Sequence, residues 1–585
     1  MQSYSVTQNP GGQSQPFPQI IPQPPDPKWN PAQLVYGFLA ASASVGNGQK
    51  IAREYLAPGV KWAPNFSATV FKNGLGPVIK STTQVPAKGP GKPASVVVTV
   101  GGKVQASVTQ AGKYAVPSGS GPQLGPYSFT LIKVGKVWRI SQAPSELLLT
   151  SDMFVNDYQQ RNLYFFDPTF RYLVPDPVYV PLQATPTDLM GTLVQDLTKP
   201  PGDWLSGGTR TALLGADAIG GVTLSAQTAT VNLAISKASN QDATLVPFSS
   251  QLLWTLIGSG QGGPAVQSVE LLVNGKPWSP PGSQENPVQH LPAAYSPPAN
   301  PRSGVFYYVD SAGNVLMQSD IQAKPSVPIA RLGKGSWQIA ISPNPQFPYL
   351  AALRGDGTLF TEVIGSGKLV KRAGAPQGAG YTSISWGPNG DLWATTGTQI
   401  VTLQGNVGPG QPGGDPIPVA VENANSTGPS SVGPFDAIRV APDGVRVAIV
   451  VGETVLYFGA IAQQAATRVT QKLVRIDLSP FYVAAPGTVM FSGVTWFGTD
   501  NVIALLGDQK APVLTEYPVS GGNSTSIPAP VGTTSVTAVQ GHPLIVGTAK
   551  GGMSSDAALS GAWSSIEYGS ANPTPLKGFF PVYPG

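Results

Sequence analysis

Cysteine is absent from this sequence of 585 residues, and histidine occurs only twice, at His290 and His542. The lack of cysteine excludes disulfides, catalytic thiols and thiolate metal sites, although it does not distinguish a reducing compartment from an oxidising one. Zinc sites built from His and Cys are excluded by the same counts. No D-x-[DN]-x-[DN]-G pattern indicates a calcium loop, so we expect neither a metal nor a cofactor.

Charged residues are also scarce. Asp, Glu, Lys and Arg make up 11% of the chain, with a formal net charge of +5, whereas globular proteins average about 25%. No block of five or six basic residues is present, so nucleic acid is not expected as a partner. No stretch approaches the roughly 18 apolar residues of a membrane-spanning helix, and the N-terminus lacks the basic and apolar regions of a signal peptide. As written, the chain is expected to be soluble.

Glycine and proline are abundant, with 69 and 60 residues, and 41% of the residues are hydrophobic. This combination favours turn-rich β structure with a packed core over disorder. A single hydrophobic core stops growing at about 250–300 residues. The length therefore predicts three domains, with four as the alternative.

The first part of the chain is expected to contain a tether and an α+β domain. Residues 1–29 mix Gln, Ser and Pro, which predicts an extended tether; the alternative is an irregular arm docked on the first domain. Residues 30–150 begin with Asn30-Pro31, an N-cap followed by proline at the first helical position. A second helix is expected over 49–56, and strand-like runs follow between 95 and 140. Two helices on a curved antiparallel sheet would give an NTF2-like domain.

The middle part, residues 161–282, alternates strand and helix patterns. Helices are expected over 188–197, after a cap at Thr185-Pro186, and over 249–256. An Asn274-Gly275 turn closes a hairpin near its end. These patterns predict an α/β or α+β domain, and the Pro-rich residues 283–303 predict a linker.

Residues 304–585 contain a repeat. Each repeat has an apolar strand, a turn and a second apolar strand, and the turns are anchored at Pro343, Pro388, Pro442, Gly498 and Gly541. Intervals of about 50 residues are typical of the four-stranded blades of a β-propeller. We expect about six blades, with the ring closed by strands from both ends of the region. A β-sandwich with chance similarity is the alternative.

No catalytic constellation accompanies these elements. His290 lies in the linker, His542 lies in a blade turn, and no G-x-S-x-G elbow accompanies either. Asp356-Gly357 and Asp443-Gly444 are interpreted as turn residues. The repeats lack the Asp boxes of sialidase-like propellers, although a propeller hydrolase could still use two facing carboxylates. We therefore predict no catalytic, cofactor-binding or metal-binding residues, and the binding residues stay unknown.

Tryptophan recurs in or near the blades, at Trp337, Trp386, Trp393, Trp496 and Trp563. Large aromatic side chains bury much apolar area and often fill the space between packed sheets. Their recurrence favours packing between blades over a ligand cage.

Several segments resemble those of the LpqB lipoproteins of actinobacteria. They are PAQLVYGFLAASAS from Pro31, AREYLAPG from Ala52, and QRNLYFFDPTFRYLVPDPVYVP from Gln160. The middle domain also resembles a GerMN domain, through PTDLMGTLVQDLTKPP from Pro186 and SSQLLWTLIG from Ser249. Each motif is weakly specific, but their order matches the family over about residues 30–585.

The resemblance implies a non-catalytic lipoprotein, anchored to the extracytoplasmic face of the cell membrane through an acylated cysteine. This sequence lacks that cysteine, and we interpret Met1 as a replacement start just after the lipidated position. The resemblance further implies that the protein binds the extracytoplasmic domain of a two-component sensor histidine kinase and modulates signalling and envelope processes. Two alternatives stay open: a cell-wall or carbohydrate-active propeller enzyme, and a small-molecule or lipid sensor that uses the N-terminal domain.

Overall fold

The structure is a computed structural model of the chain. It describes residues 23–43, 49–65, 67–87, 94–117, 125–182, 186–212, 217–235, 241–257, 266–279, 304–319, 327–343, 348–405, 408–411, 413–423, 433–463, 474–487, 489–569 and 573–585. Most of the expected tether, the Thr185 cap, the Pro-rich linker and His290 lie outside these ranges. The chain divides into two units, Met1–Gln160 with Val178–Thr185, and Arg161–Pro177 with Pro186–Gly585.

The first unit is an α+β fold with two four-stranded sheets, in the strand orders β2-β3-β6-β7 and β5-β4-β1-β8. Its helices are α1 (Pro31–Ala43), α2 (Lys50–Glu54) and α3 (Ser151–Asp157). Its strands are β1 (Ala68–Phe71), β2 (Val78–Val85), β3 (Ser95–Gly101), β4 (Val104–Val108), β5 (Tyr114–Ala115), β6 (Tyr127–Val134), β7 (Val137–Gln142) and β8 (Leu147–Thr150). The second sheet contains a parallel pair, β1 with β8, so the antiparallel sheet expected from the sequence accounts for only half of the strands.

Helix α1 begins where the sequence predicts. The Gln33 N–H donates to Asn30 Oδ1 and the Asn30 N–H donates to Gln33 Oε1, both at 3.0 Å. This reciprocal pair satisfies two backbone donors at the start of the helix. The buried face of α1 places Phe38 against Trp62 and Phe129, with ring centroids 5.0 and 5.9 Å apart. The core of the first unit is therefore filled by aromatic rings.

Asp157, at the C-terminal end of α3, makes the stability of the first unit depend on pH. Burial raises its pKa from 3.8 to about 6. Because the folded state binds this proton more tightly than the unfolded state, the stabilisation is complete below about pH 4 and is lost as the pH rises through about 6. Two pKa units correspond to about 2.7 kcal/mol, which solvent screening of this half-buried carboxyl reduces to roughly 1 kcal/mol.

We expect Asp157→Asn to abolish this part of the pH dependence. Chemical denaturation of both full-length proteins between pH 4 and pH 7 measures it, and the exposed Glu54→Gln change is the matched control. A variant whose unfolding free energy changes with pH as in the wild type would contradict the assignment.

The middle domain begins with a paired β9 (Tyr158–Phe166) and β10 (Leu173–Pro181), and the boundary between the two units falls within both strands. Its helices are α4 (Pro186–Leu197) and α5 (Gln241–Ile257), and its sheet has the order β11-β12-β13-β14. The bounds of these strands are β11 (Asp217–Ser225), β12 (Thr228–Ala234), β13 (Ser268–Val273) and β14 (Lys276–Trp278). β12 and β13 are parallel and α5 connects them, which is the crossover that parallel strands require.

Two sequence predictions for the middle domain can be compared with its local geometry. Asn274 and Gly275 have φ values of 51° and 79°, as a two-residue hairpin turn needs, and they join β13 to β14 as expected. Helix α5 is longer than the expected 249–256 and contains Pro247. Its observed start, Gln241, lies eight residues before the predicted start at 249.

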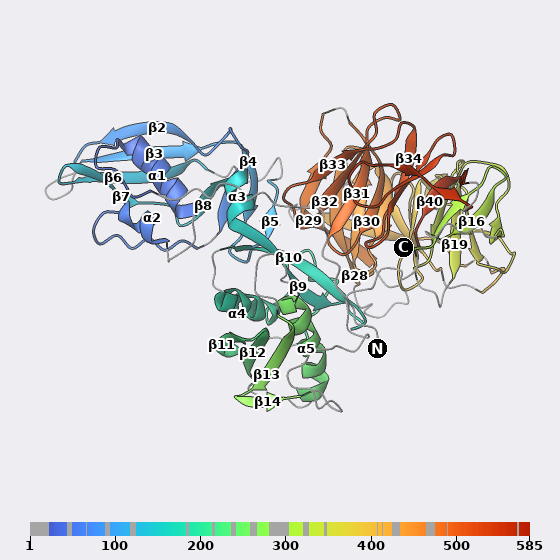
Figure 1. Cartoon of the computed structure of the whole chain (residues 1–585), viewed down its shortest axis with the longest axis horizontal. Helices are drawn as coiled ribbons and strands as arrows, with labels where there is room; N and C mark the ends of the chain where they lie inside the picture. The colour runs from blue at the N-terminus through green and yellow to red at the C-terminus, as the bar shows by residue number, and fades with distance from the viewer. Residues whose placement is uncertain are drawn as a thin grey trace. The chain divides into compact units, whose positions relative to one another are not determined.

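The described residues of 304–585 form six blades of four strands (Figure 1). The strands of the first three blades are β15 (Phe306–Val309), β16 (Asn314–Gln318), β17 (Ala330–Arg331) and β40 (Phe579–Val582); β18 (Trp337–Ile341), β19 (Tyr349–Arg354), β20 (Leu359–Val363) and β21 (Val370–Lys371); and β22 (Ser383–Trp386), β23 (Leu392–Thr395), β24 (Ile400–Leu403) and β25 (Ile417–Asn423). Those of the last three are β26 (Phe435–Val440), β27 (Arg446–Val451), β28 (Val455–Gln463) and β29 (Val474–Ala484); β30 (Phe491–Phe497), β31 (Asn501–Leu506), β32 (Val513–Pro518) and β33 (Thr525–Pro528); and β34 (Thr533–Thr537), β35 (Leu544–Thr548), β36 (Met553–Asp556) and β37 (Ser564–Ser565). A short pair, β38 (Glu567–Tyr568) and β39 (Thr574–Pro575), precedes β40.

The propeller prediction is confirmed in its repeat and in its closure. All five predicted anchors lie in the turn between the innermost strand and the second strand of a blade. The ring closes because β40, from the end of the chain, pairs with β15, with Tyr307 opposite Val582 and Val309 opposite Phe579. This pairing joins the two ends of the ring within blade one.

The third and fourth blades are joined by a pairing that the repeat does not predict. Their outermost strands, β25 and β29, run parallel from Ala420 opposite Arg475 to Asn423 opposite Leu478, which merges the two blades into one eight-stranded sheet. Arg475 also forms an ion pair with Glu422 across this junction, at 3.3 Å.

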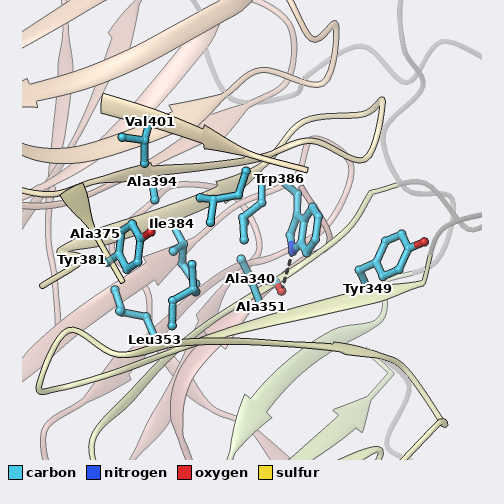
Figure 2. Close-up of a cluster of buried hydrophobic side chains, with 13 residues drawn as sticks. Ala340, Tyr349, Ala351, Leu353, Ala375, Tyr381, Ile384, Trp386, Ala394 and Val401 are labelled. Atoms are coloured by element: carbon cyan, nitrogen blue, oxygen red, sulfur yellow. Dashed lines mark hydrogen bonds between the residues drawn. The ribbon is translucent and has the colours of Figure 1, made fainter. Parts of the chain in front are cut away.

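Tryptophan side chains connect neighbouring blades, as the sequence predicts. The Trp386 indole N–H donates to the Ala340 carbonyl at 3.1 Å, between the inner strands β22 and β18 (Figure 2). The Trp496 indole N–H donates to the Arg439 carbonyl at 3.0 Å, between β30 and β26. The Trp563 indole N–H donates to the Pro528 carbonyl at 2.8 Å. Each tryptophan thus links its blade to the preceding one.

Within the described ranges, the helices are too short or too polar to span a bilayer.

Candidate functional site

The propeller channel ends in a small cavity of about 70 Å³ where the innermost strands of the blades meet. Its lining comes from β18, β22, β26, β30, β34 and β40 and from the turns that follow them. Arg439 is the one charged side chain among the described residues that line it. Neither Asp nor Glu belongs to this lining, so the pair of facing carboxylates that a propeller hydrolase would use is not found here.

The Arg439 side chain is held by oxygen atoms on one side only. Its Nη1 donates to Ser383 Oγ at 3.0 Å and to the carbonyls of Ile384 at 3.1 Å and Ile438 at 2.7 Å. Burial lowers its pKa from 12.5 to about 10. The guanidinium therefore stays protonated at neutral pH, although the desolvated charge has a free-energy cost.

A larger groove, of about 710 Å³, lies at the opposite ends of the strands of blades four and five. It is lined where β26 and β30 begin and where β27 and β31 end. Phe491 and Val450 are apolar residues of this lining, and Met490 at its rim is 51% exposed. The groove thus combines buried apolar surface with an exposed hydrophobic side chain.

Three carboxylates surround this groove, from Asp436, Glu453 and Asp508. Asp436 Oδ2 accepts the Glu453 N–H at 2.6 Å. Asp508 Oδ1 accepts the Lys510 and Ala511 N–H groups at 2.9 and 3.1 Å. Glu453 and Asp508 are exposed. The backbone therefore fixes two acidic side chains beside an apolar surface, and this acidic groove can receive a basic and apolar segment.

The turn face of blade four holds a buried ion pair. Arg446 Nε lies 2.7 Å from Asp443 Oδ2, and both side chains are 1% exposed. The guanidinium carbon of Arg446 also lies 5.3 Å from the Trp496 ring centroid, within cation–π range. Asp443 Oδ1 accepts the N–H groups of Val445 and Arg446, both at 2.9 Å. Asp443 is a turn residue, as predicted, and in addition the partner of a buried cation.

The middle domain contacts the propeller beside this ion pair, within the second unit. Asn162 Nδ2 donates to Asp500 Oδ2 at 2.8 Å. Burial raises the pKa of Asp500, and Arg446 opposes that rise. A Cβ on Gly208 would lie 2.5 Å from the Ile461 carbonyl oxygen, so only glycine permits this approach of the two backbones.

His542 and Asp356, which were considered from the sequence for a catalytic role, do not form a common site. The ring of His542 lies 6.1 Å from that of Tyr583 in a turn of blade six. Asp356 is exposed and pairs with Arg354. In the described part of the chain, His, Asp and Glu form no group of three that could hold a metal ion.

Sequence reasoning missed both the Arg439 side chain and the acidic groove. A charged residue inside the apolar strand IRV, from Ile438, was the available signal for Arg439. The groove carboxylates come from separate segments that only the ring arrangement brings together. Nothing in the spacing of Asp436, Glu453 and Asp508 identifies them.

The fold and these sites define a multidomain protein that ends in a six-bladed β-propeller. Three domain families match it in order. They are "Lipoprotein LpqB, N-terminal domain" over residues 24–155, "Sporulation and spore germination" over 162–279, and "Lipoprotein LpqB beta-propeller domain" over 314–580. The chain belongs to the LpqB lipoprotein family.

Curated relatives extend this match over most of the chain. The lipoprotein LpqB of Thermobifida fusca is 25% identical, over 98% of this chain and 93% of the relative. That of Streptomyces avermitilis is 26% identical, over 88% and 84%. That of Mycobacterium tuberculosis is 24% identical, over 93% and 89%.

Solved structures resemble the propeller more distantly. The β-propeller domain of Myceliophteria thermophila Cps50 (Swd1) has 9% identity and a TM-score of 0.30, over 43% of this chain and 91% of that one. A virginiamycin B lyase from Staphylococcus aureus has 14% identity and a TM-score of 0.28, over 43% and 80%. Likenesses of this size provide no argument about activity.

Proposed function

We propose that this chain is a non-catalytic lipoprotein of the extracytoplasmic membrane face that binds the extracytoplasmic domain of a two-component sensor histidine kinase. Through this contact it would modulate signalling and cell-envelope processes. The observation that supports a binding role is the acidic groove between blades four and five, with its apolar lining and three carboxylates. The kinase as partner is inferred from the family resemblance.

The acidic groove has the properties of a protein-binding surface. Exposed hydrophobic side chains such as Met490, next to buried apolar surface, provide the area that contributes most to binding free energy. Glu453 and Asp508 at its rim would select a basic segment and speed its approach. A partner segment that alternates basic and apolar residues would therefore fit.

The two alternative functions have less structural support. A cell-wall or carbohydrate-active enzyme in the channel would use two facing carboxylates, and the described lining contains neither Asp nor Glu. A lipid sensor would need a hollow in the first unit. There the rings of Phe38, Trp62 and Phe129 pack directly against one another.

Reversing charge at the groove is expected to weaken partner binding at least about tenfold, because it places like charges opposite the partner's basic residues. The double variant Glu453→Lys/Asp508→Lys, in the full chain, would be titrated with the purified extracytoplasmic domain of the kinase. Glu567→Lys, at an exposed position on β38, is the matched control and should bind like the wild type.

This experiment tests separately whether the kinase domain is the partner and whether the acidic groove is the surface that binds it. If the wild-type chain does not bind the kinase domain, the proposed partner is wrong. If the wild type and the groove variant bind equally well, the kinase is a partner and the groove is not its site. A loss of binding that also appears in Glu567→Lys would mean that overall charge, not the groove, drives association.

A further inference from the structure

We propose that Arg439 makes the end of the propeller channel a binding site for a small carboxylate molecule. This site is separate from the acidic groove, because the two lie at opposite ends of the inner strand β26. Binding there would require neither the kinase nor the groove. The proposal rests on the charge, the hydrogen bonds and the size of the channel end.

No Asp or Glu side chain pairs with Arg439 in the described part of the chain, although the last residue, Gly585, lines the same cavity. Desolvation is the one cause that shifts the pKa of Arg439. The residue is half-buried, and removing part of a cation from water without a compensating charge is costly. An anion taken up from solution would supply that compensation.

The hydrogen bonds of Arg439 leave the guanidinium edge formed by Nε and Nη2 available to bind a carboxylate. All three bonds to Ser383, Ile384 and Ile438 come from Nη1, and they fix the orientation of the planar group. The Nε and Nη2 donors make no hydrogen bond with the described residues. These two atoms present parallel N–H groups, which is the geometry that binds the two oxygens of a carboxylate.

The size and lining of the cavity restrict the ligand. A volume of about 70 Å³ is several times what one water molecule needs, so a carboxylate on a short carbon chain fits. Ile339, Val536 and Val582 supply apolar walls. Apolar walls lower the local dielectric constant, which strengthens the attraction between the guanidinium and an anion. Thr495 adds a polar side chain to the same lining.

Fluorine NMR can test this site with trifluoroacetate as the probe. We expect the wild-type full chain to broaden the probe resonance, and unlabelled acetate to reverse the broadening at the same ionic strength as a chloride control. Arg439→Gln should abolish the effect. Arg439→Lys should weaken affinity at least about tenfold, because an ammonium group lacks the two-pronged edge. Arg475→Gln, which changes a surface arginine in an ion pair, should behave like the wild type.

The wild-type measurement alone can overturn the proposal, whether or not the variants fold. No broadening beyond the chloride control, or broadening that survives in Arg439→Gln, means that the channel does not bind carboxylates. Competition by phosphate but not by acetate would mean a site for tetrahedral anions instead. Kinase binding that is unchanged by acetate would leave this proposal intact, since the two sites are independent.

Discussion

Replacing Trp386 with alanine is expected to lower the free energy of unfolding by about 3–5 kcal/mol, the range for removing a large aromatic side chain from a core. Trp386 is 1% exposed and stacks on Tyr349, with ring centroids 5.6 Å apart. Figure 2 shows it among side chains of blades two and three, with its indole N–H directed at the Ala340 carbonyl. Alanine would leave a cavity between the blades and a buried carbonyl without its donor.

Equilibrium denaturation of the full chain, followed by near-UV circular dichroism, measures this loss. Trp386→Phe keeps most of the ring and loses the indole donor, so it should cost less than the alanine variant. Trp563→Ala is the matched control, because Trp563 makes the same kind of link to Pro528 but is only partly buried. Equal losses in Trp386→Ala and Trp563→Ala would show that burial between the blades is not the source of the stability.

Replacing Arg446 with methionine is expected to cost about 3–5 kcal/mol, because it leaves a buried carboxylate without its cation. Asp443 is 1% exposed and lies 2.7 Å from Arg446 Nε. Asp500, whose pKa burial already raises, would lose the same nearby cation. Methionine has a similar length and can fill the space over the Trp496 ring, so the cost would come from charge rather than from packing.

A double variant separates these two causes. Arg446→Met/Asp443→Asn removes both charges, while asparagine can still accept the N–H groups of Val445 and Arg446 in the turn. It should recover most of the lost stability in the same denaturation experiment. Arg354→Met, at the exposed pair with Asp356, should cost far less stability than Arg446→Met. If the double variant is as unstable as Arg446→Met, the ion pair is not the reason for the loss.

The elements with strong local signals could be predicted from the sequence. Asn30-Pro31 fixed the start of α1, and the five turn anchors fixed the inner hairpins of five blades, because turns and caps depend on residues close together in the chain. The domain limits and the kinase partner stay predictions. The second sheet of the first unit and the parallel pairing of β25 with β29 arise from long-range contacts that no local pattern encodes.

The binding sites were less predictable than the fold for the same reason. Asp436 and Asp508 are distant in sequence and meet only because neighbouring blades place the ends of their strands together. Arg439 lies within an apolar strand whose pattern matches the inner strands of the other repeats, so the repeat pattern did not single it out. A sequence pattern shows that a strand faces a channel, but not whether a charge in that strand is neutralised by another blade.

The pairing of β40 with β15 also determines when the propeller can assemble. Blade one receives its innermost strand from residues 579–582, while its other three strands come from 306–331. During synthesis the first blade must therefore remain incomplete until the last part of the chain has emerged. Contacts of such long sequence separation form late and slowly. Until β40 is available, the stability of the early blades depends on their contacts with one another, and the edge of β15 that β40 will cover stays unpaired.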